Sequence, residues 1–182
     1  MKLLIASDIH GDIKCAEATI NAASAHGADK ILLLGDILYH GPRNDLPENY
    51  NPKAVISLLN ENREKLLCVR GNCDTEVDQM VLNFPILCDS AQVLDAENGV
   101  TLYLSHGHVY SPSKLPPVTK NTVFLYGHTH VQKIEYVGDT LCVNPGSVTL
   151  PKENNKKTYA IYEGGTISIL DFDKNVINSV KI

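Results

Sequence analysis

The sequence contains no long hydrophobic run. Its apolar start, KLLIAS, covers only residues 2–7 before Asp8 and His10 interrupt it. A signal peptide needs an apolar core of about 7–15 residues between a basic segment and a cleavage site, and a membrane-spanning helix needs about 20. Neither fits this start, so we expect a cytoplasmic protein without a membrane partner.

Low-complexity tracts and internal repeats are also absent from the sequence. Hydrophobic residues make up 43% of the chain and charged residues 20%, an ordinary balance for a globular protein that argues against disorder. A length of 182 residues suffices for one domain with a sizeable core and is short for two. We therefore expect a single domain over residues 1–182 with one principal site.

Positive charge is scarce, and the cysteines form no recognisable pairing pattern. Lysine and arginine number 16 against 21 acidic residues, so the net charge of -5 provides no general field for gathering nucleic acid. Local metals or arginines can still bind one phosphate. The five cysteines are scattered, and several lie in apolar runs such as LLCVRG, where free buried thiols are common. We expect no nucleic-acid polymer as partner and no disulfide framework.

Strand and helix patterns alternate in the first half of the chain. Apolar runs at 2–7, 30–35 and 65–71 alternate with helical patterns at 12–27 and 52–65. Asp12 is suited to cap the first helix, Gly27 to end it, and Pro52 to the first turn of the second. This order predicts β-α repeats with a parallel sheet.

The second half of the chain is predicted to be mainly β. From residue 92, short or alternating apolar segments are separated by the turn signals NG, GD, EGG and DKN. No long linker divides the two halves, so we expect an α/β fold of the α+β type, in which two mixed β-sheets pack together with helices outside. The segment 38–52 is a candidate functional loop.

Metal-capable side chains follow five of the predicted strands where each strand ends. They are Asp8 and His10, Asp36, Asn72, His106, and the pair His128 and His130. Taken singly, a carboxylate after a strand is commonly a cap or turn residue, and a lone histidine is commonly structural or exposed. Open α/β sheets place their sites at the carboxyl ends of the strands, so the recurrence favours one shared site.

These residue types suit a pair of divalent metal ions. One carboxylate, Asp36, can bridge two ions through its two oxygens. Two ions about 3.5–4 Å apart can clamp phosphoryl oxygens and lower the pKa of a water enough to supply hydroxide near neutral pH. Mixed imidazole and oxygen ligands favour manganese, iron or zinc over calcium. A structural zinc site would close with four ligands, often cysteines, whereas seven side chains leave room for water and substrate.

Five motifs, DIH, GD, GNCD, HGH and GHTH, together resemble those of the calcineurin-like metallophosphoesterases. The segments GDILYHGPRN, RGNCDTEVDQM and NPGSVTLPK are similar to loops of the small bacterial YfcE-type phosphodiesterase subgroup, and the likeness runs through nearly the whole chain. The resemblance implies a β-sandwich flanked by helices and a dinuclear centre at one edge. It also implies activity with manganese, with iron, zinc or nickel as alternatives, and it makes a homo-oligomer reasonable.

The resemblance further implies how the ligands divide between the two ions. Asp36 would bridge them; Asp8, His10 and His130 would complete one, and Asn72, His106 and His128 the other. Catalytic roles are implied for Asp36, Asn72 and Asp74. For Asp74 the residues leave two interpretations open, since it would orient water or a neighbour, or simply begin the helix at 75–80.

Two positions depart from the family pattern. Tyr39 stands where the second motif often has a further aspartate, and Cys73 stands where many relatives have a histidine that helps to protonate the leaving group. A thiol is a weaker hydrogen-bond donor than an imidazolium, so reactions with basic alkoxide leaving groups should suffer most. Cys73 therefore points to phosphodiester cleavage and a substrate contact. The alternative is that it only packs beside the site.

Three further residues are candidates for substrate binding. His108 follows His106 by two positions, and His40 and Arg43 lie in the HGPRN segment, where an arginine fork suits a phosphate oxygen. Surface exposure and loop stabilisation are the alternatives for these residues. The NPGS turn at 144–147 follows a strand and is a candidate lining of the pocket, but turn geometry explains Pro-Gly equally well, so it stays outside the catalytic set.

Three function classes fit the sequence to different degrees. The favoured one is a metal-dependent phosphodiesterase that acts on a small diester through a metal-activated water. The alternative is a protein-binding scaffold of the same fold, like the retromer subunit that the HGH, GHTH and NPGS elements also resemble. Such scaffolds tend to lose metal ligands, whereas this chain keeps His10. A redox role for Cys73 is disfavoured because no CxxC partner exists.

Overall fold

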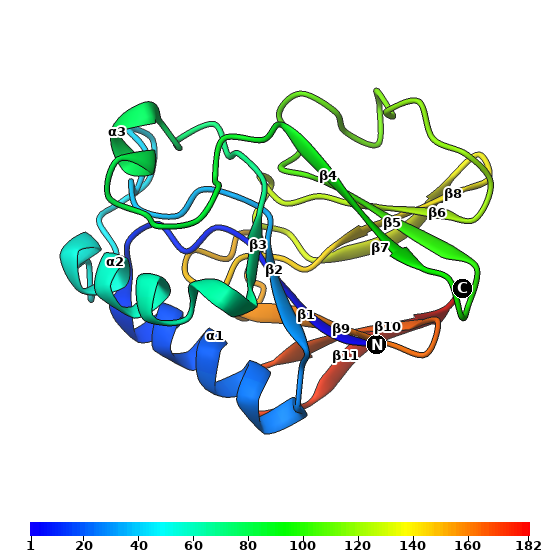
Figure 1. Cartoon of the computed structure of the whole chain (residues 1–182), viewed down its shortest axis with the longest axis horizontal. Coiled ribbons are helices and arrows are strands. Elements are labelled where there is room, and N and C mark those ends of the chain that lie inside the picture. Colours follow the sequence, from blue (N-terminus) through cyan, green and yellow to red (C-terminus); the bar gives the residue numbers. More distant parts are fainter.

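Two mixed β-sheets lie face to face in the computed structural model, which describes residues 1–182 (Figure 1). The first sheet has the order β11 (Val176–Lys181), β10 (Thr166–Asp171), β9 (Thr158–Glu163), β1 (Lys2–Ala6), β2 (Lys30–Leu33) and β3 (Leu66–Cys68). The second has the order β4 (Ser90–Asp95), β5 (Val100–Ser105), β6 (Thr122–Leu125), β8 (Thr140–Asn144) and β7 (Lys133–Val137). The predicted fold class is confirmed.

Each sheet contains a parallel core with antiparallel neighbours. In the first sheet β1, β2 and β3 are parallel, and β9 pairs with β1 in the antiparallel sense. In the second, β5, β6 and β8 are parallel, and β4 and β7 join them as antiparallel edge strands. The predicted β-α repeat thus forms the parallel part of the first sheet.

The helices follow the predicted caps. α1 (Ile13–His26) begins after Asp12, whose carboxylate accepts the Cys15 N–H at 3.0 Å, and it ends at Gly27 with φ of 65°. α2 (Pro52–Glu61) begins at its proline but is shorter than the predicted 52–65 segment. Its last predicted residues form a separate 3-10 turn, Arg63–Lys65, because the chain tightens at Asn62 before it enters β3. The third helix, α3 (Glu76–Gln79), is a single turn.

Both faces of β1 are buried, which explains why KLLIA reads as a continuous apolar run. Leu3 and Ile5 point into a cluster shared with the second sheet, whereas Leu4 and Ala6 point into a cluster shared with α1 and α2. Alternate side chains of a strand face opposite sides of its sheet, so a central strand covered on both sides has no polar face. The helices therefore pack on the outer face of the first sheet.

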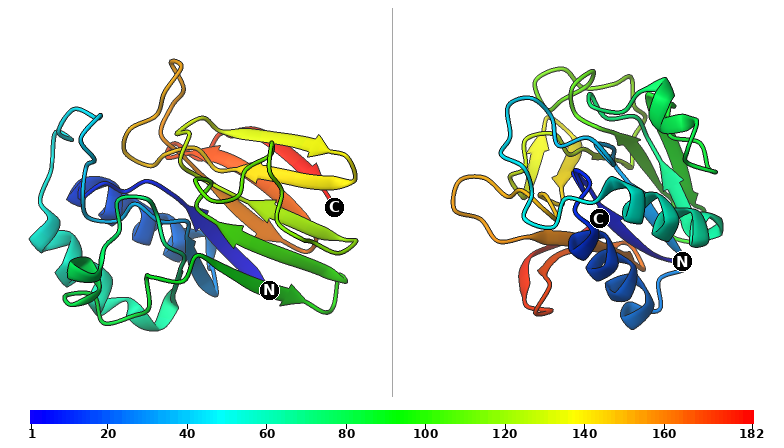
Figure 2. Two further views of the ribbon diagram at one scale, coloured as in Figure 1. Left: turned by 90° about the horizontal axis from the view of Figure 1, so that it is seen from above. Right: turned by 90° about the vertical axis from the view of Figure 1, so that its left-hand side faces the viewer.

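The helices gather away from the two chain termini, as the left view in Figure 2 shows. None of them combines the length and the apolar composition required to cross a membrane. Across the space between the sheets, the loops after β1, β2 and β3 meet the loops after β5 and β6. One bond that joins them runs from the His128 backbone N–H to Asp8 Oδ2, at 3.1 Å.

Candidate metal centre

The carboxyl ends of the parallel strands bring five predicted metal ligands together. One ligand atom each of Asp8, His10 and His130 lies within 4.8 Å of the others, and the same holds for Asp8, Asp36 and His106. His130 Nε2 lies 3.2 Å from Asp8 Oδ1, and His106 Nε2 lies 3.4 Å from Asp36 Oδ2. All five residues are at most 3% exposed. The ligands thus come from both sheets and form one buried cluster.

The other two predicted ligands border this cluster. Asn72 Oδ1 lies 3.1 Å from His106 Nε2, and the ring of His128 has its centroid 5.2 Å from that of His106. Asn72 and His128 are more exposed than the other five and line a small polar cavity with Asp36 and His130. The structure therefore places all seven predicted ligands at one edge of the sandwich.

Three of the histidines are oriented by backbone carbonyls. The Nδ1 atoms of His10, His106 and His130 donate to the carbonyl oxygens of Tyr39, Leu34 and Leu150 at 2.7, 2.6 and 2.6 Å. A carbonyl only accepts, so the proton of each neutral ring sits on Nδ1 and leaves a lone pair on Nε2. All three Nε2 atoms face the carboxylates.

A divalent cation fits this set of atoms. His10 Nε2 and His130 Nε2 lie 3.3 Å apart, and with the proton on Nδ1 neither nitrogen has a hydrogen to donate. Asp8 Oδ1 is buried without any hydrogen-bond partner. A buried carboxylate oxygen without a partner is costly, and lone pairs that face one another need a positive charge between them. The donor types also match those preferred by manganese, iron and zinc.

The charges of the cluster point the same way. Burial raises the pKa of Asp8, but the adjacent His10 and His130 rings outweigh it and hold that pKa well below its ordinary value. Burial lowers the pKa of His106, but the Asp36 hydrogen bond and the Asp8 charge raise it to about 9. The carboxylates are therefore ionised and attract positive charge to the neighbouring nitrogens.

The backbone of the site adopts an uncommon conformation. Among nine non-glycine residues with positive φ are five predicted site residues, namely Asp8, His10, Asp36, His128 and His130, with φ between 49° and 66°. Left-handed conformations cost a non-glycine residue free energy, and such strain is concentrated at functional sites. Gly71 is constrained by space instead, since a Cβ there would overlap the Asp36 carboxylate.

Asp74 supports the loops of the site. Its carboxylate accepts backbone N–H groups of Asp36, Ile37 and Gly71 at 2.8, 2.9 and 2.7 Å. Burial raises the pKa of Asp74, and the bonds from Ile37 and Gly71 oppose that shift. The residue that caps α3 is Thr75, so the interpretation that Asp74 begins this helix is wrong. Asp74 instead orients its neighbours, which was the other interpretation.

Cys73 lies at the site. Its backbone N–H donates to Asp36 Oδ1 at 2.8 Å, and its Sγ is within 4.8 Å of ligand atoms of His10 and Asp36. Burial and the negative charge of Asp36 raise the pKa of the Cys73 thiol to about 12. These protein surroundings thus favour the thiol over the thiolate.

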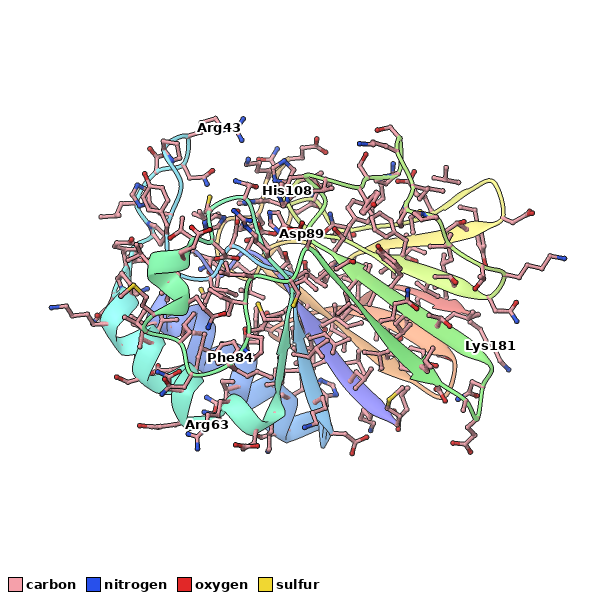
Figure 3. The ribbon with its side chains drawn as sticks, turned by 45° about the horizontal axis from the view of Figure 1, so that its top comes forward. Arg43, Arg63, Phe84, Asp89, His108 and Lys181 are labelled. Atoms are coloured by element: carbon pink, nitrogen blue, oxygen red, sulfur yellow. The ribbon has the colours of Figure 1, made fainter.

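The predicted substrate contacts lie at different distances from the polar cavity. Arg43 lines it, and Figure 3 shows Arg43 and His108 on separate loops at the same edge of the molecule. The exposed His108 ring lies 5.4 Å from that of His106. His40 does not line the cavity, because its ring packs between Tyr39 and Tyr50, with centroids at 4.8 and 5.3 Å.

Two elements of the site were missed by sequence reasoning. Lys152 lines the polar cavity together with Arg43, and its backbone N–H donates to the His130 carbonyl at 3.2 Å. Ser147, in the NPGS turn, donates its hydroxyl to the Asp8 carbonyl at 3.0 Å. The signal was the segment NPGSVTLPK itself, in which a turn is followed by a lysine.

Comparisons with known proteins agree on a family. Residues 1–166 match the calcineurin-like phosphoesterase superfamily domain. The chain is 44% identical to phosphodiesterase YfcE of Escherichia coli K12 over 183 residues, which cover 100% of this chain and 98% of that protein. The solved structure of E. coli YfcE, described as a phosphoesterase, superposes with a TM-score of 0.96 at 44% identity, and 100% of both chains is covered.

A more distant likeness concerns the fold alone. Vacuolar protein sorting 29 from Cryptosporidium parvum is 15% identical and superposes with a TM-score of 0.67, covering 100% of this chain and 98% of that one. An identity this low carries no function across.

Proposed function

Because the chain belongs to the calcineurin-like phosphoesterase superfamily, we propose that it hydrolyses a small phosphodiester at a centre of two divalent metal ions. The observation that carries this proposal is the convergence of three histidine Nε2 atoms on Asp8 Oδ1, a buried oxygen without a hydrogen-bond partner. A bound cation explains such a cluster better than a purely structural role of these residues does. The likeness to phosphodiesterase YfcE supports an enzyme of the same class.

Each ion would have its own set of protein ligands. Asp36 would be shared; Asp8, His10 and His130 would hold one ion, and Asn72, His106 and His128 the other. When bound, such a pair supplies charge to the phosphoryl oxygens and lowers the pKa of a water molecule. Manganese is the metal we propose first, on the basis of the mixed nitrogen and oxygen ligands.

Residues around the polar cavity would bind the phosphate group. Arg43 and Lys152 line the cavity with positively charged side chains, and the arginine fork suits two oxygens of one phosphate. Asn44 is fixed beside them, since its Nδ2 donates to the His40 carbonyl at 2.8 Å. This arrangement would orient a diester with its phosphorus toward the buried carboxylates.

Cys73 would favour diesters that have acidic leaving groups. A thiol whose pKa is raised to about 12 is a weak acid beside the Asp36 carboxylate and supplies little general acid catalysis. A leaving group that departs without a proton needs no such help. We therefore propose diesters with acidic alcohols as better substrates than alkyl phosphate monoesters.

The test is a substrate panel with metal content measured in parallel. The manganese-loaded chain should contain two ions, hydrolyse chromogenic diesters faster than matched monoesters, and lose activity on exhaustive chelation. Arg63→Ala is a suitable control because the Arg63 side chain lies outside the site and is about half exposed, with a relative accessibility of 49%. One ion or none at saturating manganese, or full activity after chelation, would contradict the dinuclear centre. Absence of hydrolysis with two ions bound would favour the scaffold alternative.

A further inference from the structure

An apolar groove lies beside the polar cavity. Its walls are formed by the loop after β2, by the start of α2 and by the segment around α3; the main side chains are Leu38, Tyr39, Tyr50, Ile56, Val77 and Val81. We call this feature the apolar groove. Its volume of about 440 Å³ lies within the range of about 300–1,000 Å³ that is typical of small-molecule sites.

The apolar groove and the polar cavity adjoin at one residue. Cys73 lines both, while its backbone N–H is bonded to the Asp36 carboxylate. The wall of the groove is also fixed to the metal centre, because the Tyr39 carbonyl accepts the Nδ1 proton of His10 at 2.7 Å. A molecule whose phosphate occupies the cavity therefore has an apolar surface directly beyond Cys73.

The groove presents apolar surface to water and few free polar groups. Tyr39, Val77 and Val81 are 42%, 69% and 41% exposed. Its polar members Thr75 and Asp78 satisfy each other, since Asp78 Oδ2 accepts the Thr75 backbone N–H at 2.7 Å and its hydroxyl at 2.8 Å. Contiguous exposed apolar residues of this kind mark binding surfaces. The groove thus suits an apolar group without charge.

We propose that the apolar groove is a substrate subsite that receives one ester group of the diester, and that the substrate class is a phosphodiester with an aromatic or similarly bulky apolar alcohol. This inference rests on the proposed function for the position of the phosphate. A second copy of the chain is a weaker fit as occupant. A stable protein interface buries about 800 Å² on each partner, whereas this is a hollow of ten residues that shares Cys73 with the cavity.

The subsite is tested with two diesters that differ only in one apolar group. Dimethyl phosphate and benzyl methyl phosphate carry the same charge and have slow alkyl leaving groups, so their affinities for the full manganese-loaded chain can be measured by calorimetry. Partial burial of the phenyl ring should make benzyl methyl phosphate bind about tenfold more tightly. Either ester group can turn toward the groove, so the comparison does not depend on which one leaves. Equal affinities, or no binding of either ligand, would overturn the subsite.

Groove variants locate the effect. Val77→Asn and Val81→Asn place neutral amides on the wall without changing the charge near the phosphate, and Val176→Asn on β11 is the matched control at 60% exposure. The two groove substitutions, combined in one chain, should remove most of the tenfold preference and leave the affinity for dimethyl phosphate unchanged. The control should keep the preference and the affinity of the unmodified chain. An unaltered preference, or a fall in the molecular mass of an oligomer without a change in affinities, would overturn the proposal. Failure to hydrolyse any diester would count against the proposed function alone, because these affinities are measured without turnover.

Discussion

Replacement of Asp74 by asparagine should both destabilise the fold and loosen the metal centre. The two oxygens of this carboxylate accept three backbone N–H groups, from Asp36, Ile37 and Gly71. An asparagine keeps one accepting oxygen. In its best orientation that oxygen retains the bonds from Asp36 and Gly71, and the amide NH₂ then faces the Ile37 N–H. One bond is lost and one buried donor is left without a partner.

The magnitude follows from these bonds. A hydrogen bond to a charged group contributes about 1.5–3 kcal/mol, and an unsatisfied buried donor costs about 1–3 kcal/mol. Allowing for partial relaxation, we expect Asp74→Asn to lower the free energy of unfolding by about 2–4 kcal/mol. For a chain of this size that corresponds to a fall in Tm of about 4–16 °C. Metal affinity should fall by about 10–100-fold, the usual cost of losing a residue that orients ligands.

The matched control is Asp78→Asn, four residues further along. Asp78 Oδ2 accepts the backbone N–H and the hydroxyl of Thr75 at the start of α3. An asparagine oxygen can retain these bonds, so this change should cost less than about 1 kcal/mol and leave metal affinity unchanged. Thermal unfolding followed by circular dichroism, and calorimetric titration with manganese, measure the two effects. If both variants lose equal stability and bind manganese like the unmodified chain, Asp74 does not organise the site.

Three further predictions concern the site itself. Asp36→Asn should reduce hydrolysis more than Arg43→Ala, because Asp36 is central to the buried cluster whereas Arg43 lines only the cavity. Steady-state assays measure this, with circular dichroism as a folding check. Comparable losses in the two variants would refute the bridging role of Asp36. The Tm of the metal-free chain should fall as pH rises from 7 to 10. The pKa of His106 is about 9 in the folded chain against an ordinary 6.5, so the stabilisation from its protonated ring is fully present below pH 6.5 and is lost as pH rises through 9. The same slope in His106→Gln would refute that assignment. Cys73→Ala should keep most diesterase activity. Cys73→His should raise the ratio of monoesterase to diesterase kcat/KM, but by less than the about 10²–10⁴-fold of well-placed acid catalysis. If this ratio is unchanged in both variants while the metals stay bound, position 73 is remote from the leaving group.

The fold followed closely from local patterns in the sequence. The apolar run at 2–7 predicted the strand β1 of a parallel sheet, and Asp12 and Gly27 predicted the ends of α1. The end of α2 was predicted wrongly, because NENREK has ordinary helical residues and only the return to β3 shortens the helix. The tertiary structure therefore sets the end of α2, where helix propensity alone gives no stop signal.

The ligand set was predictable from the sequence, but the orientation of its members was not. Carboxylates and histidines after consecutive parallel strands must meet at one edge, whatever the lengths of the intervening loops. The bonds that aim them depend on backbone groups of other segments, such as the Leu34 carbonyl beneath His106 and the Leu150 carbonyl beneath His130. Lys152 was missed for the same reason, since only the fold brings its loop to Arg43.

Cysteine at position 73 links the chemistry of the site to its shape. A thiol with a pKa of about 12 supplies little acid, which favours diesters whose alcohol departs readily as an anion. The same small side chain lies between the polar cavity and the apolar groove, where a histidine ring would occupy space now shared by both. Gly41 also lines the polar cavity, and a Cβ on it would come within 3.3 Å of the Cys73 sulfur, so there is little free space around this sulfur. Phenols are both more acidic and more apolar than small alkyl alcohols, so weak acid catalysis and the apolar groove would favour the same kind of substrate.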